Sequence, residues 1–271
     1  MLRGVSRGKG EELTAVERIT SRRNPLCERI RRMSGSASAR RERGEFLCDS
    51  PKLLEEILLW RPELLRVVLC TEGTVLPALP AGVVSASVPP DVMETLSPVK
   101  TPQGVLSVCA LPEQALPELL PGRRYVVLDG VQDPGNVGTI LRTADALGAD
   151  GLFLVNDCAD LYSPKTVRAS MGAVLRCPAW ACGPQELRAL LTRSGLPLYG
   201  AALRSDTADV RELDYTRAAV AIGSEGRGLS EGLLALCDRT VRIPMAAHCE
   251  SLNAAAAASV LLWEMARGDP R

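Results

Sequence analysis

The sequence has a single histidine, His248, and none of its nine cysteines stands in a C-x-x-C pair. Structural and catalytic zinc sites draw on histidines and paired cysteines, so the sequence predicts no metal centre. An odd cysteine count in a chain of 271 residues also argues against a disulfide-stabilised scaffold. We therefore expect reduced thiols and a cytoplasmic protein.

Long apolar segments are missing as well. The first ten residues, MLRGVSRGKG, lack the apolar core of a signal peptide, and no run approaches the roughly 18 apolar residues of a membrane span. We expect neither a signal peptide nor a membrane partner. With 46% hydrophobic and 24% charged residues, the composition is that of a globular protein long enough for two domains.

A net charge is also lacking, because 32 basic residues balance 32 acidic ones. The charge is unevenly distributed, however. Residues 1–49 hold twelve Lys or Arg and seven Asp or Glu, which leaves the front of the chain positive and the remainder negative. A basic front suits a polyanionic partner, and a solvated helix face is an alternative of equal weight.

The front of the chain reads as a small α/β domain at residues 16–110, after a flexible tail at 1–15 and before a proline-rich linker at 111–122. Apolar spacing and turn residues predict helices at 24–33, 52–60 and 91–96, with a break at 34–36. They predict strands at 45–48, 66–70, 83–88 and 105–109.

Residues 123–271 read as a second α/β domain. Strands are predicted at 125–129, 151–155, 177–180, 198–203, 218–223 and 240–243, and helices at 139–147, 163–172, 185–193 and 254–267. The strands are apolar throughout rather than alternating, which indicates a parallel sheet covered on both faces. Such a sheet binds ligands at the carboxyl ends of its strands.

Three polar or glycine-rich clusters follow predicted strands. In the first, at 133–144, Asn136 is placed to cap a helix, Gly135 and Gly138 permit close backbone approach, and Arg142 lies either at the edge of a cleft or in solvent. The second, at 223–230, carries Glu225 in a glycine-rich loop that does not match the dinucleotide-binding fingerprint.

The third cluster combines Ile243-Pro244-Met245 with Ser251-Leu252-Asn253, where Ser251 is either a site residue or only the cap of the following helix. The order of the three clusters, P-G-N-V-G-T-I-L-R-T-A, then G-S-E-G-R-G-L, then I-P-M with E-S-L-N-A-A-A-A-A, resembles the motifs of the SpoU (TrmH) branch of the SPOUT RNA methyltransferases.

The front half is similar to the substrate-binding domain of the ribosomal RNA members, which is like ribosomal protein L30e. This similarity rests on Ile19-Thr20-Ser21, Asn24-Pro25, Gly44-Glu45-Phe46-Leu47 and Thr101-Pro102-Gln103-Gly104. Two departures stand out: Asp49-Ser50 replaces the usual Glu-Gly, and His248-Cys249-Glu250 replaces smaller residues.

The resemblance implies a fold and an activity. We expect a C-terminal parallel sheet with a deep trefoil knot, a homodimer in which the two knots meet, and S-adenosylmethionine-dependent 2′-O-methylation of a ribose, with 23S ribosomal RNA as the favoured substrate. It implies methyl-donor contacts at Gly223, Ile243 and Leu252. The catalytic residues carried over by motif match are Asn136, Arg142, Glu225, Ser251 and Asn253.

Phosphate contacts are expected from Arg22, Arg23, Arg31 and Arg32 of the basic front. Aromatic residues make up only 3% of the chain, so arginine is expected to replace aromatic rings in stacking on bases. Three alternatives stay open: a transfer RNA methyltransferase, a catalytically silent RNA-binding dimer, and a nucleotide-binding α/β enzyme that does not act on RNA.

Overall fold

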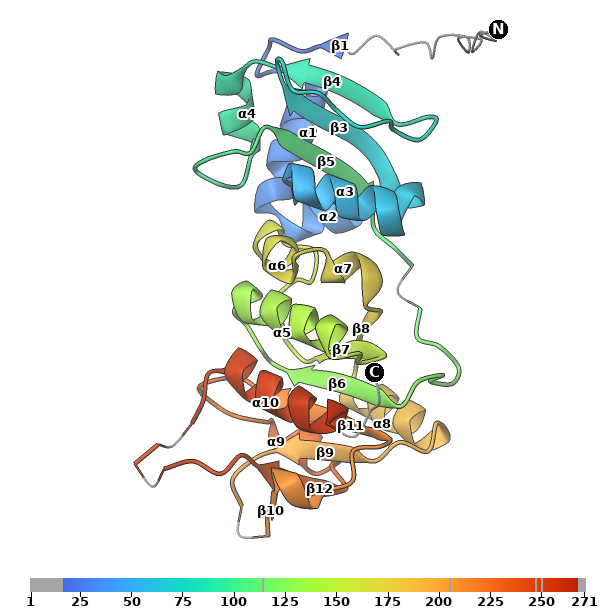
Figure 1. Ribbon diagram of the computed structural model, residues 1–271, viewed down its shortest axis with the longest axis vertical. Helices are drawn as coiled ribbons and strands as arrows, with labels where there is room; N and C mark the ends of the chain where they lie inside the picture. Colours follow the sequence, from blue (N-terminus) through green and yellow to red (C-terminus); the bar gives the residue numbers. More distant parts are fainter. Residues whose placement is uncertain (1–16, 114, 205, 247, 250, 268–271) are drawn as a thin grey trace, which may run out of the picture.

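The computed structural model describes residues 17–113, 115–204, 206–246, 248–249 and 251–267. Within this part of the chain, five strands form a sheet in residues 17–110 and seven strands form a second sheet in residues 124–242. Figure 1 shows the two sheets one above the other along the long axis of the molecule. The predicted tail at 1–15 lies outside the described residues.

The front sheet has the order β1-β4-β3-β5-β2. β1, β4 and β3 are parallel, and β5 runs antiparallel to both β3 and β2. The bounds are β1 (Glu17–Arg18), β2 (Glu45–Asp49), β3 (Leu65–Thr71), β4 (Val84–Val88) and β5 (Val105–Ala110). All four strands predicted for this region are confirmed, and only the two-residue β1 was not predicted.

Helices cover both faces of the front sheet. α1 (Pro25–Gly35) and α4 (Pro90–Leu96) pack on one face, and α3 (Pro51–Trp60) packs on the other, followed by a 3-10 turn at Pro62–Leu64. The predicted break at 34–36 is followed by a helix that the sequence reading missed, α2 (Ala37–Arg43). Ser36 separates α1 from α2 because its hydroxyl accepts a hydrogen bond from Ala39 N and caps α2.

The second sheet has the order β10-β12-β9-β11-β6-β7-β8 and is parallel throughout, as the continuous apolar strands predicted. Its strands are β6 (Arg124–Asp129), β7 (Gly151–Val155), β8 (Ala179–Cys182), β9 (Leu198–Ala201), β10 (Ala208–Asp209), β11 (Ala218–Gly223) and β12 (Arg239–Arg242). β8 starts two residues later than predicted, and β10 was not predicted.

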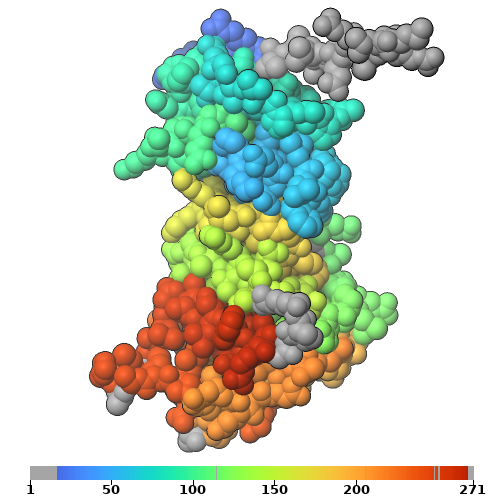
Figure 2. Space-filling model, viewed as in Figure 1, coloured from blue at the N-terminus to red at the C-terminus, as the bar shows by residue number. Residues whose placement is uncertain are grey.

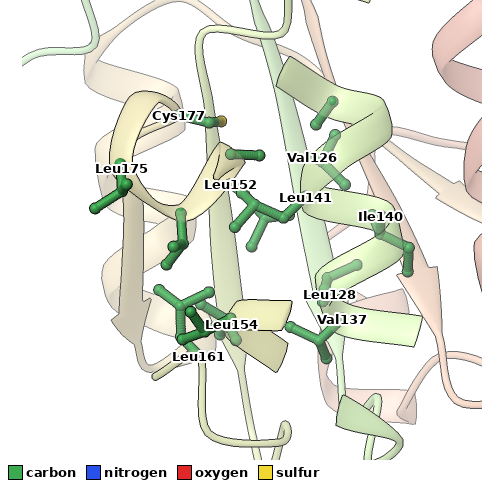
Figure 3. Packing of buried hydrophobic residues seen from close by; sticks show 14 of the residues in the cluster. Val126, Leu128, Val137, Ile140, Leu141, Leu152, Leu154, Leu161, Leu175 and Cys177 are labelled. Carbon is green, nitrogen blue, oxygen red and sulfur yellow. The ribbon is translucent and has the colours of Figure 1, made fainter. Parts of the chain in front are cut away.

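Helices also cover both faces of this sheet. α5 (Pro134–Ala146) and α10 (Ala254–Ala266) pack on one face together with α6 (Pro164–Ser170) and α7 (Ala173–Arg176), whereas α8 (Pro184–Arg193) and α9 (Glu231–Leu234) pack on the other. Figure 3 shows apolar side chains of α5 meeting those of β6 and β7. Among the described residues, every helix is too short or too polar to cross a lipid bilayer.

The predicted cap of α5 is wrong, and the alternative in which Ser251 is only the cap of α10 is excluded. α5 begins five residues earlier than predicted, at Pro134, and Asp133 rather than Asn136 is its N-cap, accepting a hydrogen bond from Asn136 N at 2.9 Å. At α10 the cap is Asn253 rather than Ser251, because the Asn253 side chain accepts from Ala255 N and Ala256 N. At α5 the proline at the first helical position sets the start of the helix, which makes Asp133 the cap and places Asn136 inside the first turn.

The junction between the two sheets is formed by α2 and α3 of the front half and by α6 and α7 of the C-terminal half. Arg40 of α2 is buried and donates to Asp160 at 2.5 Å, while Arg176 of α7 contacts both Glu56 and Asp145. One continuous apolar cluster crosses the junction, with side chains from α3 and β2 on one side and from α5 and α7 on the other.

Candidate active site

A cavity of about 270 Å³ opens at the carboxyl ends of β9, β11 and β12, beside the first turn of α10. Five of the predicted site residues line it: Gly223, Glu225, Ile243, Ser251 and Leu252. The position at the strand ends is the one expected for a parallel α/β sheet. In Figure 2 the segment that follows β12 and forms one wall of the cavity stands out from the body of the molecule.

The walls of the cavity are mainly apolar. Ile222, Ile243 and Met245 contribute side chains, and Leu203 and Leu252 line it while remaining 63% and 39% exposed. Two large apolar side chains left open to solvent in a concave site are typical of a binding surface for a ligand with an apolar face. The residues present therefore suit a ligand with an apolar face.

Gly223 is required by the fold of the loop that follows β11. A Cβ at this position would lie 2.0 Å from the backbone carbon of Gly228 and 2.3 Å from the nitrogen of Leu229. Ser224 and Gly228 exchange two backbone hydrogen bonds, of 3.1 and 2.8 Å, which close the loop over Gly223. The absence of a side chain thus permits the loop to fold back on itself, and the same loop lines the cavity.

The far end of this loop is held by a buried carboxylate that the sequence reading missed. Asp129, at the carboxyl end of β6, accepts a hydrogen bond from Ser230 N at 2.6 Å and another from Asn156 Nδ2. Asn156 adopts a left-handed backbone conformation, with φ 57°, that directs its amide to this carboxylate. The sequence signal that could have identified it is the position of Asp129 as the last residue of a predicted buried strand.

Three predicted catalytic residues meet beside the cavity. Asn136 donates through Nδ2 to Glu225, and Asn253 Nδ2 donates to Asn136 Oδ1 at 3.2 Å. The first turn of α5, the loop after β11 and the cap of α10 therefore converge through one asparagine. This arrangement presents amide and carboxylate groups of both donor and acceptor character at the mouth of the cavity.

Asp133 supports this cluster from the side. Lys165 Nζ lies 2.8 Å from Asp133 Oδ2, and this hydrogen bond, followed by the one from Asn136 N, lowers the pKa of the Asp133 carboxyl. Asp133 is thereby kept ionised as the acceptor that caps α5. Asp133 directly precedes Pro134, and this order is typical of a helix start, a signal that the sequence analysis did not use.

Arg142 and Ser251 are not brought into this cluster. The Arg142 side chain is exposed, does not line the cavity, and forms no hydrogen bond or ion pair with the described residues. Glu225 does not contact Arg142 within one chain, since its carboxylate accepts from Asn136 instead. Six helical residues separate Arg142 from Asn136, which places them about 9 Å apart along α5 and on different faces.

The predicted phosphate-binding arginines divide into two kinds. Arg22 forms an ion pair with Asp91, and Arg31 donates to the backbone carbonyl of Arg22. The side chains of Arg23 and Arg32 are exposed and form no hydrogen bond or ion pair with the described residues. Arg32 also lines a small hollow of about 50 Å³ together with Arg29 and Arg43.

His248 and Cys249 lie exposed in the segment between β12 and α10. The described residues include no group of three or more His, Cys, Asp or Glu side chains able to hold a metal ion. All nine cysteines are unpaired thiols, and burial raises the pKa of Cys177 to about 12. The predicted polar residues at the cavity contribute the amides of Asn136 and Asn253, the hydroxyl of Ser251 and the carboxylate of Glu225.

Comparison with known proteins agrees with this geometry. Residues 123–263 match the model of the SpoU rRNA Methylase family. The chain is 33% identical to the 23S rRNA (uridine(2479)-2′-O)-methyltransferase of Streptomyces viridochromogenes, over 97% of this chain and 96% of the relative. It is 32% identical to the 23S rRNA (guanosine(2553)-2′-O)-methyltransferase RlmP of Bacillus subtilis, over 81% of this chain and 88% of the relative.

Solved structures give the same result. An AdoMet-bound rRNA methyltransferase from Sinorhizobium meliloti superposes with a TM-score of 0.82 at 29% identity, covering 93% of this chain and 98% of that one. The SpoU methyltransferase AviRb from Streptomyces viridochromogenes, in complex with AdoMet, gives a TM-score of 0.82 at 31% identity over 90% and 98% of the two chains. The chain therefore belongs to the SpoU rRNA methylase family.

Proposed function

We propose that this protein transfers a methyl group from S-adenosylmethionine to the 2′-oxygen of a ribose in 23S ribosomal RNA, in the cytoplasm. The observation that carries the proposal is the convergence of Asn136, Glu225 and Asn253 at the mouth of an apolar cavity. Relatives named as 23S rRNA 2′-O-methyltransferases, similar over most of the chain, support the substrate.

The cavity suits the methyl donor. Ile243 and Leu252 offer apolar faces to a purine ring, and the backbone of the loop that closes over Gly223 offers polar groups. When bound, S-adenosylmethionine supplies an electrophilic methyl group on a sulfonium. The apolar walls exclude water from that group, which favours the ribose oxygen as the attacking nucleophile.

The polar cluster handles the ribose. Asn136 and Asn253 hold the sugar by hydrogen bonds, and Ser251, which lines the same cavity, adds a hydroxyl. Glu225 is exposed at the cavity and accepts the proton that leaves the 2′-oxygen. Such proton transfer contributes roughly 10²–10⁴-fold, so alignment of the oxygen with the methyl group supplies much of the remainder.

Arg142 acts by charge in this scheme. A guanidinium with a pKa above ~12 is a poor base but stabilises a developing alkoxide and binds phosphate. Because Arg142 does not line the cavity of its own chain, we propose that it enters the cavity of a second copy. Ala256, Val260 and Trp263 form an exposed apolar row on α10, which packs against α5, and this row supports a homodimer through these helices.

The remaining expectations stay proposals. We propose a trefoil knot in residues 123–271, with the front half at 16–110 and the linker at 111–122. Arg23 and Arg32, together with Arg22 and Arg31, are proposed to bind RNA phosphates. To bind phosphate, Arg22 leaves its ion pair with Asp91, and Arg31 leaves the backbone carbonyl of Arg22.

Arg142→Ala tests the mechanism. We expect methyl transfer to 23S ribosomal RNA to fall at least about 100-fold with unchanged methyl-donor affinity, because a charge at the reacting oxygen is lost. Arg193→Ala removes an equally exposed arginine from α8 and should retain full activity. Unchanged turnover in Arg142→Ala would refute the role of this residue.

Mixed dimers test the shared site. If Arg142 acts across the dimer, mixing Arg142→Ala with Glu225→Gln protein should restore about a quarter of wild-type activity, because half of the dimers are mixed and each has one intact site. If Arg142 acts within its own chain, mixing restores nothing.

Loss of 2′-O-methyl marks from 23S ribosomal RNA in a strain lacking the protein would identify the nucleotide, and loss from transfer RNA instead would refute the substrate.

A further inference from the structure

α6 carries exposed side chains that the mechanism above does not use. Lys165 and Arg168 are three residues apart, so their side chains project from the same side of the helix. Both are exposed, while Thr166, Val167 and Ser170 are buried. Figure 1 shows α6 between the two sheets, next to the helix α5 that bears the catalytic asparagine.

Packing fixes the row formed by Lys165 and Arg168 on α6 relative to the catalytic cluster. A Cβ at Gly138 of α5 would lie 2.4 Å from the backbone oxygen of Thr166 and 2.6 Å from the Cβ of Ala169. The close approach that Gly138 permits is therefore between α5 and α6 rather than toward a ligand. Because the two helices touch at their backbones, the side chains of α6 keep a constant position with respect to Asn136.

Lys165 lies one contact away from the reaction centre. Its ammonium pairs with Asp133, which in turn accepts the backbone N–H of Asn136. The side chains of Lys165 and Asp133 are 63% and 48% exposed, and ion pairs so open to water are weak. A phosphate can therefore take over this ammonium at little cost, while Asp133 continues to cap α5.

Arg168 extends the row toward the front sheet. Its side chain forms no hydrogen bond or ion pair with the described residues, and the carboxylate of Asp49 is near enough to interact with its charge. Asp49 accepts a hydrogen bond from Ser97 at 2.8 Å, and the loop that starts at Ser97 exposes Lys100. Exposed cations thus lie on α6, next to Asn136, and in the loop of the front half that follows Ser97.

Met171 ends the row. It is 48% exposed and holds a left-handed backbone conformation, with φ 49°, at the C-cap of α6. An exposed thioether side chain in a backbone conformation that costs energy is a place to look for a function. Two cations followed by an adaptable apolar side chain suit a single RNA strand, with its phosphates and unstacked bases, better than an acidic protein.

We propose that Lys165 and Arg168 bind phosphates of the nucleotides beside the target ribose and that Met171 contacts an unstacked base, so that α6 leads the strand from the front sheet to Asn136. The inference rests on the proposed function, and it assigns to α6 a role that neither the catalytic cluster nor the arginines of the front half fulfil. α6 binds the strand without reading its sequence, since phosphate contacts position but do not specify.

The test compares two double variants for binding to in vitro transcribed 23S ribosomal RNA across a range of salt concentrations. Lys165→Gln/Arg168→Gln should weaken binding about ten-fold near 0.1 M salt and reduce the salt slope by about 1.4, since each phosphate contact on a single strand contributes about 0.7. Arg193→Gln/Arg239→Gln removes two exposed cations from elsewhere and should change neither quantity. Methyl-donor affinity should be unaltered in both.

The charge-conserving variant Lys165→Arg/Arg168→Lys keeps the inference testable if the neutral variant folds poorly, because it should retain the wild-type salt slope. Equal slopes for wild type and the neutral variant would overturn the role of α6 while methyl transfer by the wild type upholds the proposed function. Failure of the wild type to bind or methylate 23S ribosomal RNA would overturn both. Binding of an acidic peptide in place of RNA at α6 would also refute the inference.

Discussion

At the junction, Arg40 and Arg176 each contact carboxylates of other elements and are largely withdrawn from water. Around the cavity and α5, by contrast, the side chains of Arg142, Arg227 and Arg242 are exposed and form no hydrogen bond or ion pair with the described residues. A charge that is satisfied inside the chain fixes geometry, whereas a charge left open is available to a ligand. The comparison indicates that the front sheet is a fixed extension of the catalytic half.

The largest effect is expected at the junction. Arg40→Met should lower the free energy of unfolding by about 2–4 kcal/mol, because it leaves Asp160 and the carbonyl of Met33 without their buried donor. Urea titration followed by circular dichroism measures this loss. Arg18→Met, which breaks the exposed pair with Glu72, should lower the free energy of unfolding much less, because water screens that pair. Equal losses in the two variants would contradict the view that the junction is held by satisfied charges.

The next effect concerns the contact between α5 and α6. Gly138→Ala should destabilise the protein by about 1–3 kcal/mol, since the added methyl overlaps backbone and the helices must move apart. Methyl transfer should fall with it, because Asn136 shifts with α5. Gly232→Ala in α9 is the matched control: nothing lies within 4 Å of the added Cβ, so stability should be unchanged or slightly raised. Thermal melts and activity assays on both variants separate a packing effect from a general intolerance of alanine.

The sequence predicted local features of both regions well. Apolar runs located the strands of the parallel sheet, and the order of the three clusters located the cavity between β11, β12 and α10. These features depend on residues close together in the chain. The wrong cap of α5 also concerns a local feature, because Pro134 at the first helical position makes Asp133 rather than Asn136 the cap.

What the sequence could not predict depends on distant partners. Arg40 looks like any other arginine of the basic front, since its partner Asp160 is 120 residues away. Glycine at position 138 indicated a close approach, but only the fold identifies α6 as the neighbour. Likewise, nothing near Arg142 in the sequence shows that its side chain points away from its own cavity.

The smallest effect is expected where the junction meets the row on α6. Burial raises the pKa of the Asp49 carboxyl, against the opposing influence of the Ser97 hydrogen bond and the Arg168 charge, and Asp49 Oδ1 has no hydrogen-bond partner. A raised folded-state pKa means that the folded protein binds the proton more tightly than the unfolded chain. Its favourable contribution is complete below the unfolded value of about 3.9 and is lost as pH rises through the folded value.

Asp49→Asn keeps the shape of this side chain and removes its charge. The variant should therefore gain stability relative to wild type as pH rises from about 4 to 7. Melting temperatures across this pH range measure the gain, and Asp91→Asn, at an exposed carboxylate of the same front half, should show no such trend. A wild type that becomes more stable than Asp49→Asn toward pH 7 would mean that Arg168 stabilises the ionised carboxylate. In that case Arg168 would stabilise the junction and would not be available to RNA. It would then belong with the paired arginines Arg40 and Arg176 rather than with the unpaired ones.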